Sequence, residues 1–195
     1  MSTSSEASKS STILLHPTIA KLFKELPKEE PAAPPVAPTL DLTPNQEKAI
    51  THLFRYDSAI LIAPTGTGKT VVALSAIQER LYAQDNKRAI VVAPPKVINN
   101  WPIEAVKWGI ALKLALLTGA PAERAAMVND QTNNVLIVSL NNLNSLLALD
   151  HGCDLILIDE LSKATGKQTS KLKNKPADTI TTRWAMTATP VSESF

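Results

Sequence analysis

The sequence predicts an α/β domain whose mainly parallel sheet carries helices on both faces. Short apolar runs such as AILIA and AIVVA are hydrophobic at every position, as strands buried on both faces are. Stretches with helical spacing separate most of these runs, so strands and helices alternate along the chain. The length of 195 residues has room for one ordinary domain and a tail.

The domain is expected to cover residues 42–195. Its first helix starts at a capping signal, with Thr43 as N-cap, Pro44 in the first helical position and Gln46 in the third. Strands are then expected at the apolar runs, and helices at the stretches between them. The expected strands are 58–63, 89–93, 112–117, 135–140, 155–158 and 184–187, and the expected helices include 70–83, 101–108, 122–128 and 142–149.

Residues 1–41 are expected to form a disordered, proline-rich tail. Residues 1–12 contain eight serines or threonines and little to bury. Residues 27–44 contain six prolines, which indicate a semi-rigid extended spacer. Between them, apolar residues recur on one helix face of 13–26, which predicts a short helix at 17–26. This helix either packs on the chain's own domain or docks on a protein partner, and the sequence leaves both alternatives open.

The composition excludes several classes of protein. The 20 basic and 18 acidic side chains leave a formal charge of only +2, so a nucleic-acid surface would have to be a local patch. The single cysteine, Cys153, excludes a disulfide scaffold and a zinc site built from cysteines. No apolar run approaches the ~20 residues of a membrane span, and residues 1–12 lack a signal-peptide core. We therefore expect no membrane partner and a cytoplasmic location, in the host cytoplasm if the protein is viral.

The strongest functional signal is the glycine-rich segment 63–70, APTGTGKT, which lies between an apolar strand and a helical stretch. Its glycines permit a tight turn whose N–H groups face phosphate oxygens, and the helix adds the positive end of its dipole. Lys69 can reach the β- and γ-phosphates, and the Thr70 hydroxyl can bind Mg²⁺. The strict pattern begins with glycine, where this chain has Ala63. The segment predicts ATP and Mg²⁺ as cofactors, held by Pro64, Thr65, Gly66, Thr67, Gly68, Lys69 and Thr70.

A second signal is the acidic pair Asp159-Glu160, which directly follows the apolar strand LILI. Two carboxylates at the end of a buried strand are costly unless a ligand uses their charge. Beside a phosphate loop, Asp159 is expected to hold Mg²⁺ and Glu160 to orient and activate the attacking water. Lys69 and Glu160 are therefore the expected catalytic residues. The alternative is a pair of solvated acids at a strand end.

In five segments the chain resembles the superfamily 2 helicases and translocases. It is most similar to the first RecA-like domain of the chromatin-remodeller type, including the short forms carried by phages. Residues 42–46 resemble the segment whose glutamine, here Gln46, reads adenine. The other similar segments are 63–70 (motif I), 91–96 with 100–108 (motif Ia and its trailing tryptophans), 159–162 (Asp-Glu-Leu-Ser in place of Asp-Glu-Ala-His) and 186–190 (motif III).

The resemblance implies a RecA-like P-loop NTPase domain, in a family where ATP sits between two such domains. The second domain supplies the arginine fingers and half of the nucleic-acid track in that family. Because the sequence ends at Phe195, just after motif III, we expect a second RecA-like domain or subunit as a partner, and weak hydrolysis by this chain alone. Two positions depart from the family pattern. Ser162 replaces a histidine that helps couple the nucleotide site to motif III, and Ala188 stands where many members have glycine.

A basic segment at residues 161–175 is the expected nucleic-acid surface. It carries five lysines and no acidic residue, and lysines neutralise phosphates without reading base sequence. In the similar family, nearby loops face the nucleic acid, and we expect DNA rather than RNA. The alternative is a solvated loop. The expected contact residues are Lys163, Lys167, Lys171, Lys173 and Lys175, joined by Lys96 and Thr189 through the resemblance to motifs Ia and III.

The remaining aromatic and polar residues indicate packing. Trp101 and Trp108 lie seven residues apart on one face of an expected helix, which predicts core positions. Cys153 and His151 adjoin an apolar strand and are expected to be structural.

The sequence therefore predicts the ATP-binding half of a nucleic-acid-dependent ATPase, a helicase or DNA translocase. The competing prediction is a non-catalytic module derived from a helicase domain, which regulates or binds a partner. The presence of Lys69, Thr70, Asp159 and Glu160 favours the ATPase, because a scaffold needs none of these side chains.

Overall fold

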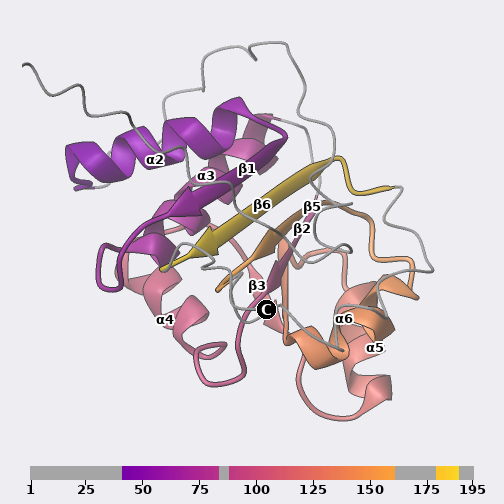
Figure 1. The fold of residues 1–195 in the computed structure, drawn as a ribbon. Helices are drawn as coiled ribbons and strands as arrows, with labels where there is room; N and C mark the ends of the chain where they lie inside the picture. Colours follow the sequence, from indigo (N-terminus) through magenta and orange to yellow (C-terminus); the bar gives the residue numbers. More distant parts are fainter. Residues whose placement is uncertain (1–40, 84–87, 161–178, 189–195) are drawn as a thin grey trace, which may run out of the picture.

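The computed structural model of the protein describes residues 41–83, 88–160 and 179–188. Its centre is a six-stranded sheet with the strand order β1-β6-β5-β2-β4-β3, and helices cover the two faces (Figure 1). In chain order the described elements are α2 (Pro44–Arg55), β1 (Ser58–Ile62), α3 (Lys69–Ala83), β2 (Arg88–Val92), α4 (Asn100–Lys107), β3 (Leu114–Leu116), α5 (Pro121–Asn129), β4 (Val135–Val138), α6 (Leu140–Leu147), β5 (Cys153–Ile158) and β6 (Thr182–Thr187).

Every strand pairing in the described part of the chain is parallel, which confirms the α/β class. A helix joins each pair of consecutive strands from β1 to β5, as parallel neighbours require. Strands β2, β4 and β5 are buried along their whole length, because both of their faces are covered. The strands and helices expected after residue 42 are all present, with shifts of up to two residues at their ends. Helix α6, for example, begins at Leu140 rather than at residue 142 because Ser139 already takes the extended N-cap conformation.

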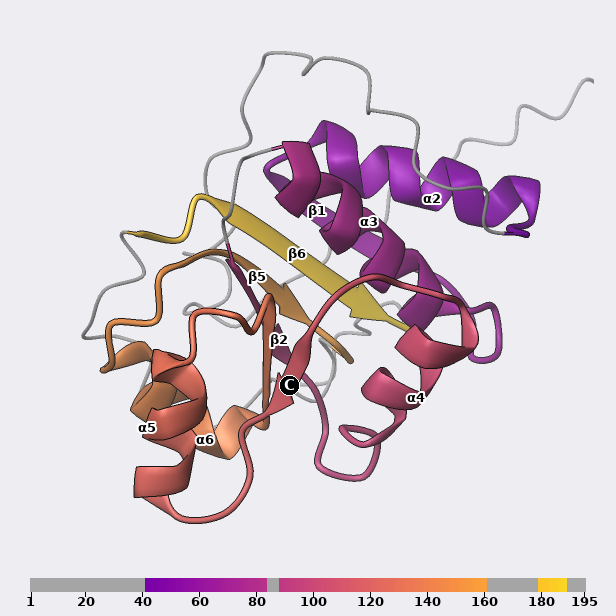
Figure 2. The same ribbon diagram turned by 180° about the vertical axis from the view of Figure 1, so that it is seen from behind.

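The core consists of two apolar layers, one on each face of the sheet. Helices α2, α3 and α4 contribute to the first layer, in which Leu53, Leu74 and Trp101 are buried. Helices α5 and α6 contribute to the second layer through Val128 and Leu143. Figures 1 and 2 show α5 and α6 together at one end of the molecule, away from α2 and α3. The expectation of helices on both faces is therefore confirmed, and Trp101 packs in the core as predicted.

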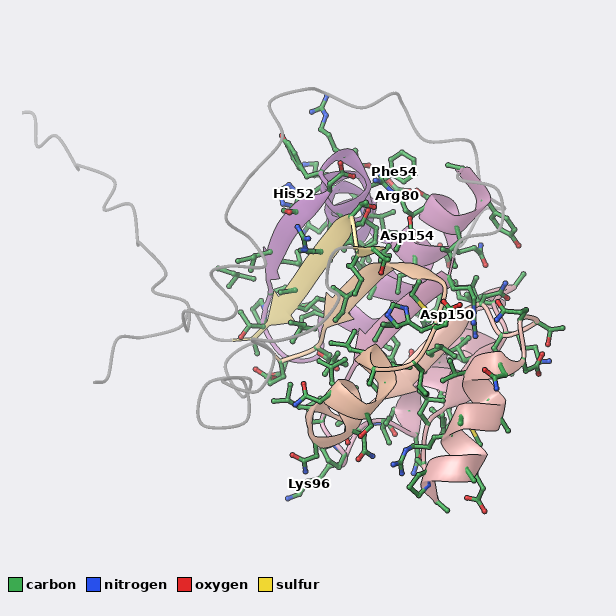
Figure 3. The ribbon with its side chains drawn as sticks, turned by 90° about the vertical axis from the view of Figure 1, so that its right-hand side faces the viewer. His52, Phe54, Arg80, Lys96, Asp150 and Asp154 are labelled. Carbon is green, nitrogen blue, oxygen red and sulfur yellow. The ribbon has the colours of Figure 1, made fainter. Side chains whose placement is uncertain are left out.

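The carboxyl ends of the strands meet at one edge of the sheet, as they must when all strands are parallel. The segment 63–68 follows β1, the segment 93–96 follows β2, and the pair 159–160 follows β5. In open α/β sheets, ligands bind at this edge. The opposite edge holds a structural cluster in which Arg80 donates to Asp57 and to Thr182. Figure 3 shows Arg80 and Lys96 at opposite ends of the molecule.

The predicted tail, including the helix expected at 17–26, lies outside the described residues, as do residues 161–178 and 189–195. Among the helices of the described ranges, none has the length and apolar character needed to cross a membrane.

Candidate functional site

The glycine-rich segment forms a tight connection between β1, which ends at Ile62, and α3, which begins at Lys69. Gly66 and Gly68 both have positive φ angles, of 80° and 81°, which side-chain-bearing residues rarely adopt. At Gly68 a Cβ atom would lie 2.4 Å from Nε2 of Gln46. The backbone angle favours glycine at position 68, and a larger residue there would also displace the Gln46 amide.

Backbone donors of this loop remain available to a ligand. Within the described part of the chain, the N–H groups of Thr65, Gly66 and Gly68 donate no backbone hydrogen bond. The first N–H groups of α3 add to these donors, since the first turn of a helix has no intrahelical acceptors. The loop is solvent-exposed at residues 64–67. Such a concentration of N–H groups at a helix N-terminus suits an anion with several oxygens, which is the property expected of a phosphate site.

The Lys69 side chain lies back over the loop. Its Nζ donates to the carbonyl oxygens of Ala63 and Pro64, each at 2.9 Å. The Thr67 hydroxyl donates to the same Pro64 oxygen at 2.8 Å. The ammonium group is therefore placed inside the turn, at the start of α3. Thr70, the next residue, is half-buried in the first turn of that helix.

Gln46 connects the start of α2 to the loop. The capping box predicted from the sequence is present, with Oε1 of Gln46 accepting from the Thr43 N–H at 2.9 Å. The other end of the same amide, Nε2, donates to the Thr67 carbonyl at 3.2 Å. The capping arrangement thus fixes the position of Gln46 against the segment 63–70, where the resemblance expects a residue that reads adenine.

The acidic pair lies at the end of β5, two strands from β1. The Asp159 N–H donates to the Val92 carbonyl at 2.8 Å, which extends the pairing of β5 with β2. Burial, followed by the charge of Glu160, raises the pKa of the Asp159 carboxyl. The Lys69 ammonium and a hydrogen bond from Trp101 act in the opposite direction on this pKa. The loop follows β1 and the acidic pair follows β5, with β6 between the two strands, so both lie at the carboxyl edge of the sheet.

Glu160 has an uncommon backbone conformation. Its φ angle of 61° lies in the left-handed region, which is uncommon for a residue other than glycine. Its Oε1 accepts a hydrogen bond from the Thr187 hydroxyl at 3.4 Å. Thr187 ends β6, the strand between β1 and β5. The sequence did not predict this contact between Thr187 and Glu160, nor the hydrogen bond from Trp101 to Asp159. No local pattern marks either contact, because its two residues lie far apart in the chain.

Of the residues predicted to bind nucleic acid, the structure describes only Lys96. Lys96 is exposed in the segment that follows β2, at the same edge of the sheet. The lysines of 161–175 and Thr189 lie outside the described residues.

In the described ranges, no group of three or more His, Cys, Asp and Glu side chains could hold a metal ion. Thr70 and Asp159 suit Mg²⁺, which takes few protein ligands and keeps waters or phosphate oxygens in its remaining positions.

Comparison with protein families gives a match over most of the chain. The model of the DEAD/DEAH box helicase family matches residues 43–194.

Individual relatives include helicases and chromatin remodellers. The chain is 25% identical over 145 residues to the chromatin remodeling factor mit1 of Schizosaccharomyces pombe, a match that covers 66% of this chain and 10% of mit1. It is 31% identical over 105 residues to the putative protein p41 of Acyrthosiphon pisum secondary endosymbiont phage 1, covering 51% of this chain and 23% of p41. It is 26% identical over 179 residues to the DNA repair and recombination protein RAD54 of Oryza sativa, covering 79% of this chain and 18% of RAD54.

Solved structures share the fold. The SWI2/SNF2 ATPase core of Sulfolobus solfataricus in complex with dsDNA superposes with a TM-score of 0.64 at 19% identity, over 77% of this chain and 32% of that chain. The Hef helicase domain of Pyrococcus furiosus superposes with a TM-score of 0.61 at 21% identity, over 76% of this chain and 33% of that chain. The chain thus spans about a third of the solved helicase chains, and less than a quarter of each relative described above.

Proposed function

The chain belongs to the DEAD/DEAH box helicase family, and from this premise we propose that it is the ATP-binding half of a nucleic-acid-dependent ATPase. The observation that carries the proposal is the meeting of two groups at one edge of the sheet. The loop 63–70 follows β1, and Asp159 and Glu160 follow β5, with β6 between the two strands.

The site fits Mg²⁺–ATP. The available N–H groups of the loop would donate hydrogen bonds to the phosphate oxygens, while Lys69 would exchange its two carbonyl partners for the β- and γ-phosphates. Thr70 and Asp159 would hold the Mg²⁺ ion, which supplies charge neutralisation on the transferring phosphoryl group. The position of Gln46 beside the loop supports a role in holding the adenine end of the nucleotide.

Glu160 is proposed to orient the attacking water and accept its proton. A carboxylate acts as a general base when it lies within hydrogen-bond reach of the water, so its position matters first. The left-handed backbone of Glu160 and the bond from Thr187 hold its side chain in place. Because Thr187 ends β6, a conformational change at residues 186–190 could alter this hydrogen bond. The position of the attacking water would then change as well.

A second domain or subunit is proposed to complete the active site. Arginine fingers stabilise the transferring phosphoryl group and contribute about 10³–10⁵ in rate in related NTPases. In this fold, Arg80 is bonded to Asp57 and Arg183 stands at the beginning of β6, both at the edge opposite the loop. A strand rises about 3.3 Å per residue, so neither guanidinium reaches the phosphate site from there. We therefore propose slow hydrolysis by this polypeptide alone.

Nucleic acid is proposed as the activating partner, with DNA favoured over RNA. The dsDNA in the similar Sulfolobus ATPase core supports DNA. The lysines of 161–175 follow the acidic pair in the sequence, and Lys96 is exposed at the same edge of the sheet. Contacts from lysines to phosphates would bind DNA without base specificity.

Calorimetric titration of the full chain with ATP and Mg²⁺ tests the nucleotide site. We expect Lys69→Ala to weaken ATP binding by about 10- to 100-fold, since a hydrogen bond to a charged group contributes about 1.5–3 kcal/mol. The matched control is Lys107→Ala, because Lys107 is an exposed lysine of α4. Circular dichroism checks that both variants remain folded. Equal affinities of wild type and Lys69→Ala would contradict the assignment of the loop.

Turnover separates the ATPase from the non-catalytic alternative. We expect Glu160→Gln to retain ATP binding and to lose hydrolysis measured with DNA present, because glutamine cannot accept the proton of water. Binding of ATP by the wild type without any hydrolysis, even with DNA, would instead support a regulatory or partner-binding module.

A further inference from the structure

Trp101 contacts the acidic pair from a different part of the chain. It lies in the first turn of α4, and its side chain is 1% exposed in the apolar layer to which α2, α3 and α4 contribute. Its indole N–H donates a hydrogen bond to the Asp159 carboxylate. An indole nitrogen is a donor only, so a buried one needs an acceptor, and here the carboxylate supplies it.

The alternation of side chains along β5 explains why Trp101 and Asp159 meet. Successive side chains of a strand point to opposite faces of the sheet. Leu157 packs in the same layer as Trp101, and Ile158 packs in the layer on the other face. Asp159 continues the pairing of β5 with β2 through the Val92 carbonyl, so its side chain returns to the face on which Trp101 lies.

The hydrogen bond fixes an orientation that the backbone of Asp159 leaves open. The Asp159 N–H, bonded to the Val92 carbonyl at 2.8 Å, sets only where the residue stands. The torsion that turns an aspartate carboxylate is broad, so its oxygens have no single preferred direction. A donor on one of them limits this rotation. Removing such a partner of a metal-binding group typically lowers metal affinity by about 10- to 100-fold.

We propose that Trp101 is a positioning residue of the ATP site, whose indole N–H holds the Asp159 carboxylate in the orientation that binds Mg²⁺. This inference rests on the proposed function, which assigns Asp159 to the ion. Trp101 itself would contact neither the nucleotide nor the ion and would act through Asp159 alone. The sequence predicted a core position for Trp101, and the hydrogen bond adds a polar role for the same side chain.

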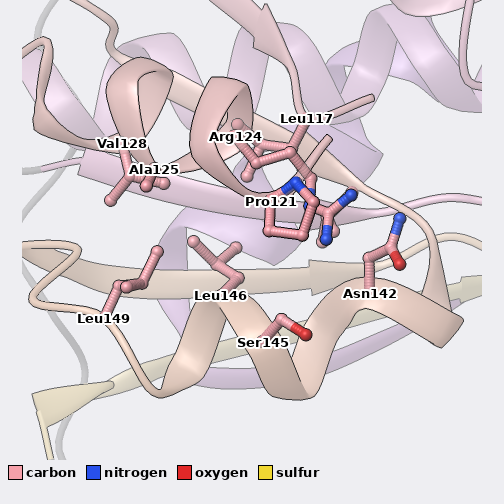
Figure 4. Close-up of a pocket in the computed structure, with 10 residues that line it drawn as sticks. Leu117, Pro121, Arg124, Ala125, Val128, Asn142, Ser145, Leu146 and Leu149 are labelled. Carbon is pink, nitrogen blue, oxygen red and sulfur yellow. The ribbon is translucent and has the colours of Figure 1, made fainter. Parts of the chain in front are cut away.

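A pocket between α5 and α6 lies apart from this site (Figure 4). Its volume of about 160 Å³ is below the roughly 300–1,000 Å³ of pockets for drug-sized ligands, so a nucleotide does not fit in it. Leu117, Val128 and Leu146 line it, and they belong to the apolar layer on the other face of the sheet. The pocket therefore does not contribute to a titration with ATP.

NMR of the ¹⁵N-labelled full chain tests the hydrogen bond in the absence of nucleotide. The chain has three tryptophans, so the loss of one indole signal in Trp108→Phe and of another in Trp184→Phe assigns the third signal to Trp101. A carboxylate acceptor moves an N–H proton downfield, so Asp159→Ala should move the Trp101 signal upfield. The Trp184 N–H donates to the Tyr56 carbonyl at 2.9 Å, and its signal should stay in place. A Trp101 signal unmoved by Asp159→Ala overturns the proposal.

Calorimetric titration with ATP tests the positioning role, with each protein measured once in Mg²⁺ and once in EDTA. The ratio of the two ATP affinities isolates the contribution of the metal. Trp101→Phe keeps an aromatic ring and removes the N–H, so we expect this ratio to fall about 10-fold while the affinity in EDTA stays unchanged. The matched control is Trp184→Phe, which removes an indole N–H from the same apolar layer and should keep the wild-type ratio.

The outcomes separate this proposal from the proposed function. A Trp101→Phe variant with the wild-type ratio would overturn the role of Trp101 and leave the proposed ATP site unaffected. Equal losses in Trp101→Phe and Trp184→Phe would indicate a general loosening of the core and would also overturn that role. A wild type that binds no ATP would contradict the ATP site itself, and the positioning role with it, even where NMR shows the hydrogen bond.

The wild type offers a further test that needs no change at Trp101. Adding Mg²⁺ to its ATP complex should shift the Trp101 indole signal, because the Asp159 carboxylate then shares its charge between the N–H and the ion. The Trp184 signal serves as the internal reference. A Trp101 signal that does not respond to Mg²⁺ overturns the proposal.

Discussion

Gly68 and Gln46 come close together where the loop 63–70 meets the start of α2. The Nε2 atom of Gln46 donates to the Thr67 carbonyl and lies where a Cβ of residue 68 would stand. A side chain at position 68 would therefore displace Gln46 as well as straining the backbone. The absence of a side chain at position 68 thus leaves room for the Gln46 amide against the loop.

The first prediction concerns this contact. Gly68→Ala should destabilise the protein by more than Gly109→Ala, measured by urea unfolding. Both glycines have positive φ, which costs about 1–2 kcal/mol for another residue, but nothing lies within 4 Å of a Cβ at Gly109. The excess loss at position 68 should become smaller when Gln46→Ala is added, because of the close neighbours only Cγ1 of Val71, 3.2 Å from a Cβ at Gly68, then remains. Equal losses at the two glycines would show that the contact with Gln46 has no energetic weight.

Arg88, at the amino end of β2, forms hydrogen bonds with three other segments of the chain. The residue is 4% exposed, and its guanidinium donates to the carbonyl oxygens of Val128, Asn133 and His151 at 2.8–3.0 Å. A buried charge is stable only when its donors are satisfied, and here backbone carbonyls take the place of a carboxylate. Val128 lies in the last turn of α5, where the negative end of the helix dipole adds to the attraction.

The second prediction follows from the planar fork of this arginine. Arg88→Lys should destabilise the protein by about 2–4 kcal/mol in urea unfolding, because one ammonium cannot reach three carbonyls on separate segments. The control is Arg124→Lys in α5, whose guanidinium donates to one carbonyl, that of Gly119, so that a smaller loss of about 0.5–1.5 kcal/mol is expected. A loss at Arg88 no larger than in the control would mean that the carbonyl bonds add little to stability.

His151 makes the loop before β5 sensitive to acid. Its Nδ1 accepts from the Cys153 N–H at 3.0 Å, which requires an unprotonated nitrogen. Burial, the largest cause, lowers the pKa of His151, and the nearby Arg88 charge lowers it further, while Asp150 acts to raise it. The unfolded chain therefore takes up a proton at a higher pH than the folded chain does. The stability that the neutral ring contributes is present above about pH 6.5 and is lost as the pH falls from there through the folded pKa.

The third prediction is the resulting pH dependence. Between pH 7.5 and 5.5, wild type should lose more stability in urea unfolding than His151→Asn, whose side-chain oxygen can still accept from Cys153. The control His52→Asn removes another histidine, in an exposed position of α2. Carboxyl groups titrate in all three proteins, so the difference in slope reports His151. The same slope in wild type and His151→Asn would contradict this role.

On the scale of the whole molecule, the parallel sheet gathers the proposed functional residues at one edge. The loop after β1, the acidic pair after β5 and the exposed Lys96 after β2 come from three segments of the chain. The proposed nucleic-acid surface extends this edge through the lysines of 161–175. A surface of this kind binds by releasing counterions from the nucleic acid, so its affinity depends steeply on salt.

The last prediction tests that surface in the full chain. Fluorescence anisotropy with labelled double-stranded DNA at several salt concentrations should show weaker binding for Lys171→Gln/Lys173→Gln. The slope of log affinity against log salt should flatten by about 0.9 for each phosphate contact removed. The control is Lys48→Gln/Lys107→Gln, in exposed positions of α2 and α4. Equal slopes in the two double variants would assign residues 161–175 to a solvated loop.

Much of the fold was predictable because its signals are local. The short, continuous apolar runs identified all six strands, and the capping pattern at Thr43 and Gln46 identified the start of α2. Boundaries were less predictable. Strand β3 has three residues, where the apolar run 112–117 suggested six, because pairing with β4 limits it to Leu114–Leu116. Apolar composition shows which segment enters the sheet, whereas its length depends on the neighbouring strand.

The sequence by itself determined the glycine-rich loop 63–70, the acidic pair and the order of strands and helices along the chain. These features depend on residues a few positions apart, whose geometry the backbone fixes locally. Only the tertiary structure decided that Gln46 meets Thr67, that Thr187 meets Glu160, and that α5 and α6 leave a pocket between them. Those contacts join residues 21 and 27 positions apart, or two separate helices, and they exist because β6 lies between β1 and β5 and because α5 and α6 pack on the same face. Strand order and helix placement follow from how the whole core is buried, which no local segment of the sequence specifies.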